Sequence, residues 1–269
     1  MAGYGFRTTR YEKMVINEIF YSLQGEGFLA GVPSVFVRVA GCPLRCRWCD
    51  TKYAWEPTAG TEYRVREVVG AVERWPCRFV VVTGGEPMAN SELPELAQRL
   101  KAAGKHVTIE TAGIAYVPNL PCDLMSISPK LSNSIPDPED RGLAPTPAVG
   151  VGGTEDTSLA PTPAVGVRGT EDRKHKFLRL DIAVLRKLIH DHEYLLKFVV
   201  DSEDDLPEIE RTIEEIGDVD PEKVMLMPQA ATRDELLRKA PMVAELCKQT
   251  GFAFSQRLQI LLYDGQRAK

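Results

Sequence analysis

Three of the six cysteines in this chain lie within eight residues, at Cys42, Cys46 and Cys49, in the spacing C-x3-C-x2-C. They directly follow an apolar run, residues 34–40, which has the composition of a buried strand. Cysteine thiolates this close in the sequence can converge on one soft metal centre, either zinc or an iron–sulfur cluster. The spacing therefore predicts a metal site at the point where a buried strand ends.

The number of clustered cysteines narrows the kind of metal centre. A structural zinc site or an electron-transfer cluster normally takes four protein ligands, whereas the other three cysteines, Cys77, Cys122 and Cys247, are isolated in the sequence. Three ligands leave one position open, and the open iron of a four-iron cluster can bind and reduce a small molecule. We therefore interpret the three clustered cysteines as catalytic ligands of a [4Fe-4S] cluster, the alternative being thiols that share no ligand.

The composition fits a globular enzyme. The chain has 269 residues, of which 43% are hydrophobic, so it can bury the core of one large α/β domain. The N-terminus has no signal-peptide pattern and no apolar run approaches the ~18 residues of a membrane span, so we expect a cytoplasmic protein. The net charge of −5, without a basic run, predicts that nucleic acid is not a partner.

Hydrophobic patterns predict strands that alternate with helices. After an opening strand at 14–21, six further runs have the pattern of strands: 34–40, 79–82, 106–110, 123–128, 194–200 and 223–227. Apolar residues at helical spacing lie at 61–75, 92–103, 178–190, 206–216 and, interrupted near Pro241, 232–248. Repeated strand–crossover–strand units give a parallel sheet, so we predict an α/β fold, a partial (β/α)6 barrel related to the TIM barrel.

Candidate ligand-binding residues lie in or just after these strands, at the end of the sheet where parallel α/β folds bind ligands. Residues 23–27 (Leu-Gln-Gly-Glu-Gly) form either a simple turn or a loop whose backbone approaches a ligand. Arg38 interrupts an apolar run and lies either on an exposed face or facing an anion. Residues 83–87 (Thr-Gly-Gly-Glu-Pro) permit close backbone approach, and Lys130 could reach a ligand carboxylate.

Residues 137–172 differ in kind from the rest of the chain. The segment 144–156 recurs almost unchanged at 160–172, a tandem copy at a period of 16 residues. Two copies are too few for a solenoid, and a sequence rich in Pro, Gly and Thr cannot bury a core. We therefore expect a single domain over residues 1–269, with a disordered low-complexity insertion at 137–172.

Taken together, the motifs resemble those of a known family. The clustered cysteines, with Trp48 just before the third, are similar to the signature of radical S-adenosylmethionine (SAM) enzymes, and the Gly-Gly-Glu-Pro run resembles the segment that holds the SAM amino group. In order and spacing, the motifs at 23–27, 38, 42–51, 83–87 and 128–130 look like those of the 7-carboxy-7-deazaguanine synthase (QueE) family. The resemblance covers nearly the whole chain apart from 137–172.

This resemblance implies a reaction, its cofactors and its partners. The family's reaction is that of a carbon–nitrogen lyase, which converts 6-carboxy-5,6,7,8-tetrahydropterin to 7-carboxy-7-deazaguanine with loss of ammonia, on the route to queuosine and other 7-deazapurines. The cofactors that follow are a [4Fe-4S] cluster, SAM that is not consumed, and Mg2+. A flavodoxin- or ferredoxin-type reductant and a homodimer are also implied.

The resemblance also implies roles for single residues. The pterin would contact Leu23, Gln24, Gly25, Glu26, Arg38 and Thr83, with its carboxylate on Arg38. SAM would contact Trp48, Cys49, Asp50, Gly85, Glu110, Ser128, Pro129, Lys130 and Gln229. The cluster would bind Cys42, Cys46 and Cys49, and the hydroxyl of Thr51 would ligate magnesium. The C-terminal segment 255–262 receives no role.

Two other functions compete with this one. One is a different radical SAM activity with a protein as substrate, such as activation of a glycyl-radical enzyme. The other is a non-catalytic iron–sulfur electron-transfer protein. The loop from Gln24 to Gly27, together with Arg38, favours a small anionic substrate, and the missing fourth cysteine disfavours an electron carrier.

Overall fold

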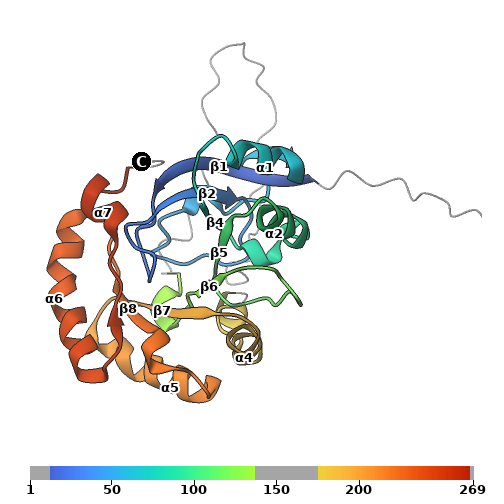
Figure 1. Cartoon of the computed structure of the whole chain (residues 1–269). Helices are drawn as coiled ribbons and strands as arrows, with labels where there is room; N and C mark the ends of the chain where they lie inside the picture. The colour runs from blue at the N-terminus through green and yellow to red at the C-terminus, as the bar shows by residue number, and fades with distance from the viewer. Residues whose placement is uncertain (1–12, 137–174, 267–269) are drawn as a thin grey trace, which may run out of the picture.

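The computed structural model describes residues 13–136 and 175–266, which are built around one curved, open sheet of nine strands (Figure 1). Across the sheet the strands follow the order β3-β1-β2-β4-β5-β6-β7-β8-β9. Their bounds are β1 (Lys13–Leu23), β2 (Pro33–Val39), β3 (Thr61–Arg64), β4 (Phe79–Gly84), β5 (His106–Thr111), β6 (Leu124–Ile127), β7 (Tyr194–Val200), β8 (Val224–Pro228) and β9 (Ala253–Phe254).

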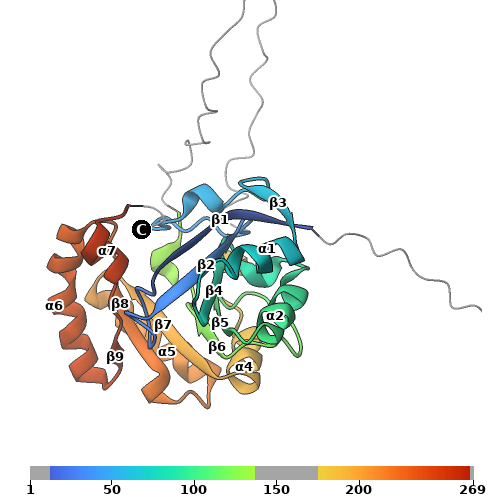
Figure 2. The same ribbon diagram turned by 45° about the horizontal axis from the view of Figure 1, so that its top comes forward.

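Helices cover the outer face of this curved sheet (Figure 2). They are α1 (Val65–Val72), α2 (Leu93–Ala102), α4 (Ile182–Asp191), α5 (Leu206–Ile216), α6 (Arg233–Thr250) and α7 (Leu258–Tyr263). Short 3-10 turns lie at η1 (Lys52–Ala54), η2 (Pro87–Ala89), η3 (Ser132–Ser134), η5 (Glu203–Asp205) and η6 (Pro221–Lys223). None of the helices in the described ranges is both long and apolar enough to cross a membrane.

The six central strands are the six that the sequence predicts, and they run parallel. Strands β2, β4, β5, β6, β7 and β8 pair in parallel in this order. Strand β1, the predicted opening strand, instead pairs antiparallel with β2. The predicted partial barrel of the α/β class is therefore confirmed. Because the central strands are parallel, their carboxyl ends meet at one edge of the sheet.

The core lies between the sheet and its helices. Amphipathic helices supply one side: α1, for example, buries Val65, Val68 and Val72, one apolar stripe at helical spacing. From the sheet, β2 contributes Val35 and Val37, both fully buried. Burial of such branched apolar side chains, at about 25 cal/mol per Å2 of apolar surface, drives the strand–helix packing.

Two local predictions were wrong, and two short elements were not predicted. The predicted helix at 61–75 is shorter, because residues 61–64 pair with β1 as strand β3 and the helix starts at Val65. Helix α6 is not interrupted at Pro241 and runs through it. Proline removes one backbone donor from the helix. The buried side chains of Leu236, Val243 and Leu246 pack on both sides of Pro241, and this packing compensates for the lost hydrogen bond. Strand β9 and helix α7 were not predicted.

The predicted insertion at 137–172 lies outside the described residues. The chain that flanks it is ordered by contacts near the cysteine loop. Ser134, before the insertion, and His175, after it, lie within hydrogen-bond distance, with 3.1 Å between Oγ and Nε2. The Nδ1 atom of His175 also accepts a hydrogen bond from the backbone amide of Arg45 at 3.1 Å. The two flanks of residues 137–174 therefore start from one place, beside the cysteine loop.

Candidate active site

A cavity of about 410 Å3 opens at the carboxyl edge of the parallel strands. It is lined by residues from nearly every strand of the sheet and from the loops that follow them. Sixteen of the residues singled out from the sequence line it: Leu23, Gln24, Gly25, Glu26, Arg38, Cys42, Cys46, Trp48, Cys49, Asp50, Thr51, Thr83, Gly85, Glu110, Ser128 and Lys130. The fold thus brings motifs that are up to 107 residues apart in the chain (Leu23 to Lys130) into one site.

The register of the strands explains this convergence. Arg38 on β2 is the direct neighbour of Thr83 on β4, and Glu110 on β5 is the neighbour of Ser126 on β6. In a parallel sheet, residues in register share a height along the strands, and alternate residues share a face. The side chains that line the cavity therefore project from the same face near the same edge.

The cysteine loop leaves β2 through Gly41, whose φ of 95° favours glycine. The loop packs against the two glycines that end β4: a Cβ atom on Gly85 would lie 2.0 Å from the carbonyl oxygen of Gly41. The amide of Glu86 donates to that same oxygen at 2.8 Å. The Gly-Gly-Glu segment therefore supports the cysteine loop by close backbone contact, which a larger residue at Gly85 would prevent.

The three cysteines are free thiols in an apolar pocket formed with Leu44 and Ala112. Burial raises the pKa of Cys42 to about 12 and that of Cys46 to about 11. A thiolate in such surroundings needs a bound cation to stabilise it, and the iron of a cluster supplies that charge. The soft donor set and the apolar surroundings therefore fit a [4Fe-4S] cluster.

The spacing of the ligands also fits a cluster better than a single ion. Among the residues that the structure describes, no three His, Cys, Asp or Glu side chains converge on one metal-ion position. A mononuclear zinc site needs that convergence, whereas each cysteine of a four-iron cluster binds a different iron.

The guanidinium of Arg45 stiffens the cysteine loop, because its Nη1 donates to the carbonyl oxygens of Cys42, at 2.6 Å, and Leu44, at 2.9 Å.

Trp48 and Lys130 lie against each other in the wall of the cavity, beside the cysteines. The Nζ of Lys130 lies 5.3 Å from the centre of the Trp48 ring and donates to the hydroxyl of Ser128 at 2.9 Å. The indole Nε1 of Trp48 is buried and has no hydrogen-bond partner among the described residues. A buried donor without a partner is costly in a folded protein, which is the pattern expected of a cofactor-binding wall.

Glu86, which the sequence marked only as part of its motif, is a structural carboxylate. It is 2% exposed, and it accepts hydrogen bonds from the amides of Met88 and Ala112 and from the hydroxyl of Thr111 at 2.7–3.0 Å. Burial raises the pKa of Glu86, although these three donors oppose the shift. Glu86 therefore ties the end of β4 to the end of β5, next to the cysteine loop.

Glu26 lies at the centre of a buried network of charges. It accepts hydrogen bonds from Lys197, from the Nε of Arg257 at 3.2 Å and from the amide of Gln259 at 2.7 Å. Burial alone would raise the pKa of Glu26, but the positive charges of Lys197 and Arg257 outweigh it and lower the pKa to about 2. Glu26 is therefore ionised at neutral pH. In the same loop, the amide of Gln24 donates to Glu110 at 3.0 Å.

Arg38 meets an anion in the structure, and that anion is Glu18 on β1. Its Nε donates to Glu18 at 2.7 Å, and the guanidinium lies 5.8 Å from the ring centre of Phe20 and 5.9 Å from that of Tyr53. Both side chains of the pair are 14% exposed. Arg38 is thus held within the cavity wall by its Nε, and no residue in the described part of the chain hydrogen-bonds to its two terminal nitrogens.

Two predicted site residues are not part of this cavity. The side chain of Gln229 turns to Lys239, whose Nζ donates to Oε1 at 2.6 Å, and Pro129 does not line the cavity either. Conversely, sequence reasoning missed several polar residues of the site, among them the three that bond Glu26: Lys197, Arg257 and Gln259. Lys197 interrupts the apolar run 194–200 as Arg38 interrupts its own run, so that signal was available. Arg257 and Gln259 carried none.

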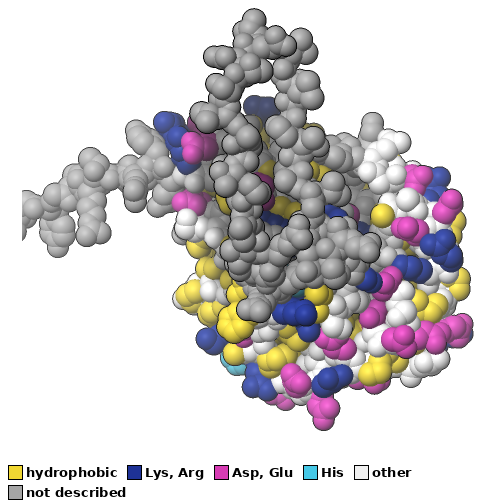
Figure 3. Space-filling model, turned by 180° about the vertical axis from the view of Figure 1, so that it is seen from behind, with side chains coloured by type: hydrophobic (Ala, Val, Ile, Leu, Met, Phe, Trp, Pro, Cys, Tyr) yellow, Lys and Arg dark blue, Asp and Glu magenta, His cyan; other side chains and the backbone are white. Residues whose placement is uncertain are grey.

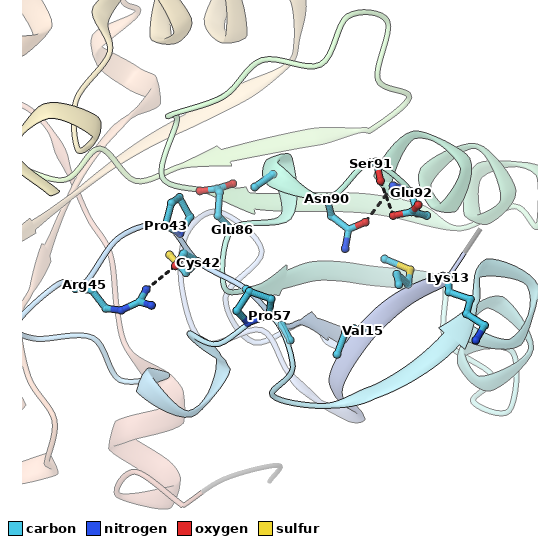
Figure 4. Close-up of a pocket in the computed structure, with 14 residues that line it drawn as sticks. Lys13, Val15, Cys42, Pro43, Arg45, Pro57, Glu86, Asn90, Ser91 and Glu92 are labelled. Carbon is cyan, nitrogen blue, oxygen red and sulfur yellow. Dashed lines mark hydrogen bonds between the residues drawn. The ribbon is translucent and has the colours of Figure 1, made fainter. Parts of the chain in front are cut away.

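A second cavity, of about 520 Å3, lies beyond Cys42 and Pro43 (Figure 4). The start of β1, at Lys13 and Val15, lines one side of it, and the segment from Glu86 to Glu92 lines the other. Cys42 is shared by both cavities. The cysteine loop therefore forms a wall between them.

Comparison with known proteins supports the interpretation of this cavity as a radical SAM site. Residues 36–128, which hold the cysteines and the Gly-Gly-Glu-Pro segment, match the Radical SAM superfamily. The chain is a radical SAM enzyme, which uses a [4Fe-4S] cluster and SAM, a small-molecule substrate and a reductant.

Relatives that match nearly the full length of this chain narrow the identification from the superfamily to one family. The 7-carboxy-7-deazaguanine synthase of Halobacterium salinarum is 39% identical over 256 residues, 93% of this chain and 90% of the relative. That of Rhodopirellula baltica is 36% identical, over 94% and 88%. The crystal structure of QueE from Escherichia coli superposes with a TM-score of 0.62 at 25% identity, covering 90% of this chain and 93% of that one. The chain belongs to the 7-carboxy-7-deazaguanine synthase family and is a radical SAM lyase of 7-deazapurine biosynthesis.

Proposed function

We propose that this chain converts 6-carboxy-5,6,7,8-tetrahydropterin to 7-carboxy-7-deazaguanine with release of ammonia. The observation that carries the proposal is the shared cavity: the cysteine loop and the polar group formed by Gln24, Glu26, Arg38 and Thr83 line the same space. A substrate on the polar group is then next to a cofactor on the cysteine side. Held by Cys42, Cys46 and Cys49, the cluster would supply the electron for reductive SAM cleavage and so the radical chemistry that removes a hydrogen atom from the substrate.

The chain's own residues would bind and orient the two molecules. Arg38 would hold the substrate carboxylate with its terminal nitrogens, and the engagement of its Nε by Glu18 supports this role. Gln24 and Glu26, with the backbone of Leu23 and Gly25, would contact the ring system. Thr51, whose hydroxyl lies 3.5 Å from the sulfur of Cys49, would ligate Mg2+ beside the substrate.

The SAM-binding role falls to residues next to the cysteines. Lys130 and Ser128 would meet the carboxylate of SAM, and the Gly85 backbone its amino group. Trp48, Asp50 and Glu110 line the same part of the cavity and would hold the remainder. Of the two residues outside the cavity, Pro129 would act by shaping this turn, and Gln229 would contact SAM through groups other than the Oε1 that Lys239 engages.

We also propose partners and surroundings that this reaction needs. A flavodoxin or ferredoxin is the reductant, because a [4Fe-4S] cluster takes one electron at a time. The net charge of −5, with acidic and basic side chains interspersed on the face in Figure 3, supports a small molecule over nucleic acid as substrate. We propose a cytoplasmic homodimer. The six free cysteines support the reducing compartment, and the homodimer rests on the resemblance to the family.

The test is anaerobic incubation of the reconstituted protein with SAM, reductant, Mg2+ and the carboxypterin. We expect 7-carboxy-7-deazaguanine and ammonia in equal amounts, while the SAM concentration stays constant. Cleavage of SAM without conversion of the pterin, under conditions in which an added glycyl-radical enzyme is activated, would instead favour the activase. A cluster that accepts an electron from the reductant but never cleaves SAM would identify an electron carrier.

A further inference from the structure

The C-terminal segment 255–259, which includes the start of α7, lies against the loop 23–27. The amide of Leu258 donates to the carbonyl oxygen of Gly25 at 2.9 Å, and the hydroxyl of Ser255 accepts from the amide of Gly27 at 3.1 Å. A Cβ atom on Gly25 would lie 1.8 Å from Oε1 of Gln259. The segment therefore contacts the loop closely at Gly25 and Gly27.

Arg257, in this segment, extends the contact to the cysteine loop. Its side chain is 7% exposed, and each of its three nitrogens has a different partner. The Nε donates to Glu26 at 3.2 Å, Nη1 to the carbonyl oxygen of Ala230 after β8, and Nη2 to Asp50 at 2.6 Å. Asp50 directly follows the third clustered cysteine. Arg257 therefore connects the loop 23–27 to the cysteine loop.

This connection has no substitute in the described part of the chain. The side-chain hydrogen bonds of Asp50 there come from Arg257 alone, whereas Glu26 also has Lys197 and Gln259. Only arginine offers three donor nitrogens in one rigid plane, and it stays protonated when buried. Lysine donates from a single nitrogen, so it would have to reach Glu26, Asp50 and the Ala230 carbonyl from one point.

We propose that Arg257 is a positioning residue, which fixes the substrate-binding loop 23–27 relative to the cysteine loop 42–51 and so aligns the substrate with the cofactor. The inference rests on the proposed function, because it takes the two loops to carry the two reacting molecules. Displacement of reacting groups by about 1 Å can cost on the order of 100-fold in rate. Loss of Arg257 should therefore uncouple SAM cleavage from product formation more than it weakens either binding step.

The test compares Arg257→Met and Arg257→Lys with Arg186→Met. Arg186 is a fitting control, because it also bonds backbone carbonyl oxygens, at Glu215 and Ile216, but does not line the cavity. Iron content, 5′-deoxyadenosine and 7-carboxy-7-deazaguanine are measured for each reconstituted variant. Both Arg257 variants should keep parental iron while their product turnover falls roughly 10- to 100-fold and their ratio of 5′-deoxyadenosine to product rises. The control should keep the parental ratio.

A second measurement does not depend on turnover. Hydrogen exchange of the cluster-loaded protein should be faster in Arg257→Lys than in the parent, both in peptides covering 23–27 and in peptides covering 42–51. If exchange and the product ratio stay parental with full iron content, the proposal is wrong. Loss of the cluster or of folding in both Arg257 variants would also overturn it, by making Arg257 a structural residue. If the parent itself forms no product, the proposed function fails, while the exchange rates still test the link between the loops.

Discussion

Replacement of Arg38 by alanine tests the substrate orientation most directly. The change removes the hydrogen bond to Glu18 and the planar donor fork that would hold the substrate carboxylate. Both side chains of this pair are 14% exposed, so the pair lies near the buried limit. Breaking a buried ion pair costs about 3 kcal/mol at the low end, and we expect this loss in the free energy of unfolding. Glu18 keeps the hydroxyl of Tyr53 as a donor at 3.1 Å, so the fold should survive.

The effect on the substrate is separate from the effect on stability. A charge-assisted hydrogen bond contributes on the order of 1.5–3 kcal/mol, and about 1.4 kcal/mol corresponds to a factor of ten. The apparent KM for the carboxypterin should therefore rise roughly 10- to 100-fold in Arg38→Ala. Arg38→Lys should restore little, because an ammonium group replaces the fork by a point charge.

The assay measures initial rates over a range of carboxypterin concentrations, with iron content and SAM binding measured in parallel. Glu18→Gln is the matched control, since it removes the charge that Arg38 meets in the structure and leaves the guanidinium in place. The control should lose stability and keep a KM near the parental one. Parental kinetics in Arg38→Ala would refute the reasoning, because Arg38 would then serve only the pair with Glu18.

The remaining predictions concern the cluster, the metal ion, the insertion and the buried carboxylate. Cys46→Ala should lose the iron and SAM cleavage, whereas Cys247→Ala should retain both; the reverse pattern in an iron assay would contradict the ligand assignment. Thr51→Ala should assemble the cluster and lose most of the stimulation of turnover by Mg2+, and equal stimulation in parent and variant would count against this ligand. Deletion of residues 144–172 should leave folding and most activity intact, since that sequence cannot build a core; a tenfold or larger fall in turnover with the cluster intact would assign it a role in the reaction. Because the folded-state pKa of Glu26 is depressed from 4.5 to about 2, its contribution to stability is full above about pH 4.5 and falls as the pH drops towards 2. The parent should therefore lose about 2 kcal/mol more than Glu26→Gln between about pH 6 and pH 3 in urea unfolding, and parallel curves would show that Glu26 is not held as an ion.

Local sequence was enough to predict the central strands and the motifs at their ends. Apolar runs such as 194–200 identify buried strands, because a strand covered on both faces has no polar alternation. Parallel pairing then requires that all carboxyl ends meet at one edge of the sheet. For this reason the sequence alone places the Gly-Gly-Glu-Pro segment and the cysteine loop together.

The differences from prediction at residues 61–64, Pro241 and Gln229 share a different cause. Strand β3 forms because residues 61–64 meet the free edge of β1, and helix α6 passes through Pro241 because its packing on β8 outweighs one lost hydrogen bond. Gln229 ends a strand as predicted, but Lys239 from α6 engages its side chain. In each case the deciding contact is made by another element of the fold, and the periodicity of a single segment carries no information about that contact.

The sequence by itself determined the chemistry: three thiolates at one strand end, an arginine within an apolar run and a glutamate in a glycine loop, each a chemical type fixed by the residue. The tertiary structure alone decided the electrostatic state of these groups. Glu26 is ionised and held because Lys197 and Arg257 reach it from positions 171 and 231 residues further along the chain. Arg38 presents its terminal nitrogens because Glu18 takes its Nε. Charge interactions depend on distance in space and on burial, and both exist only once the chain has folded.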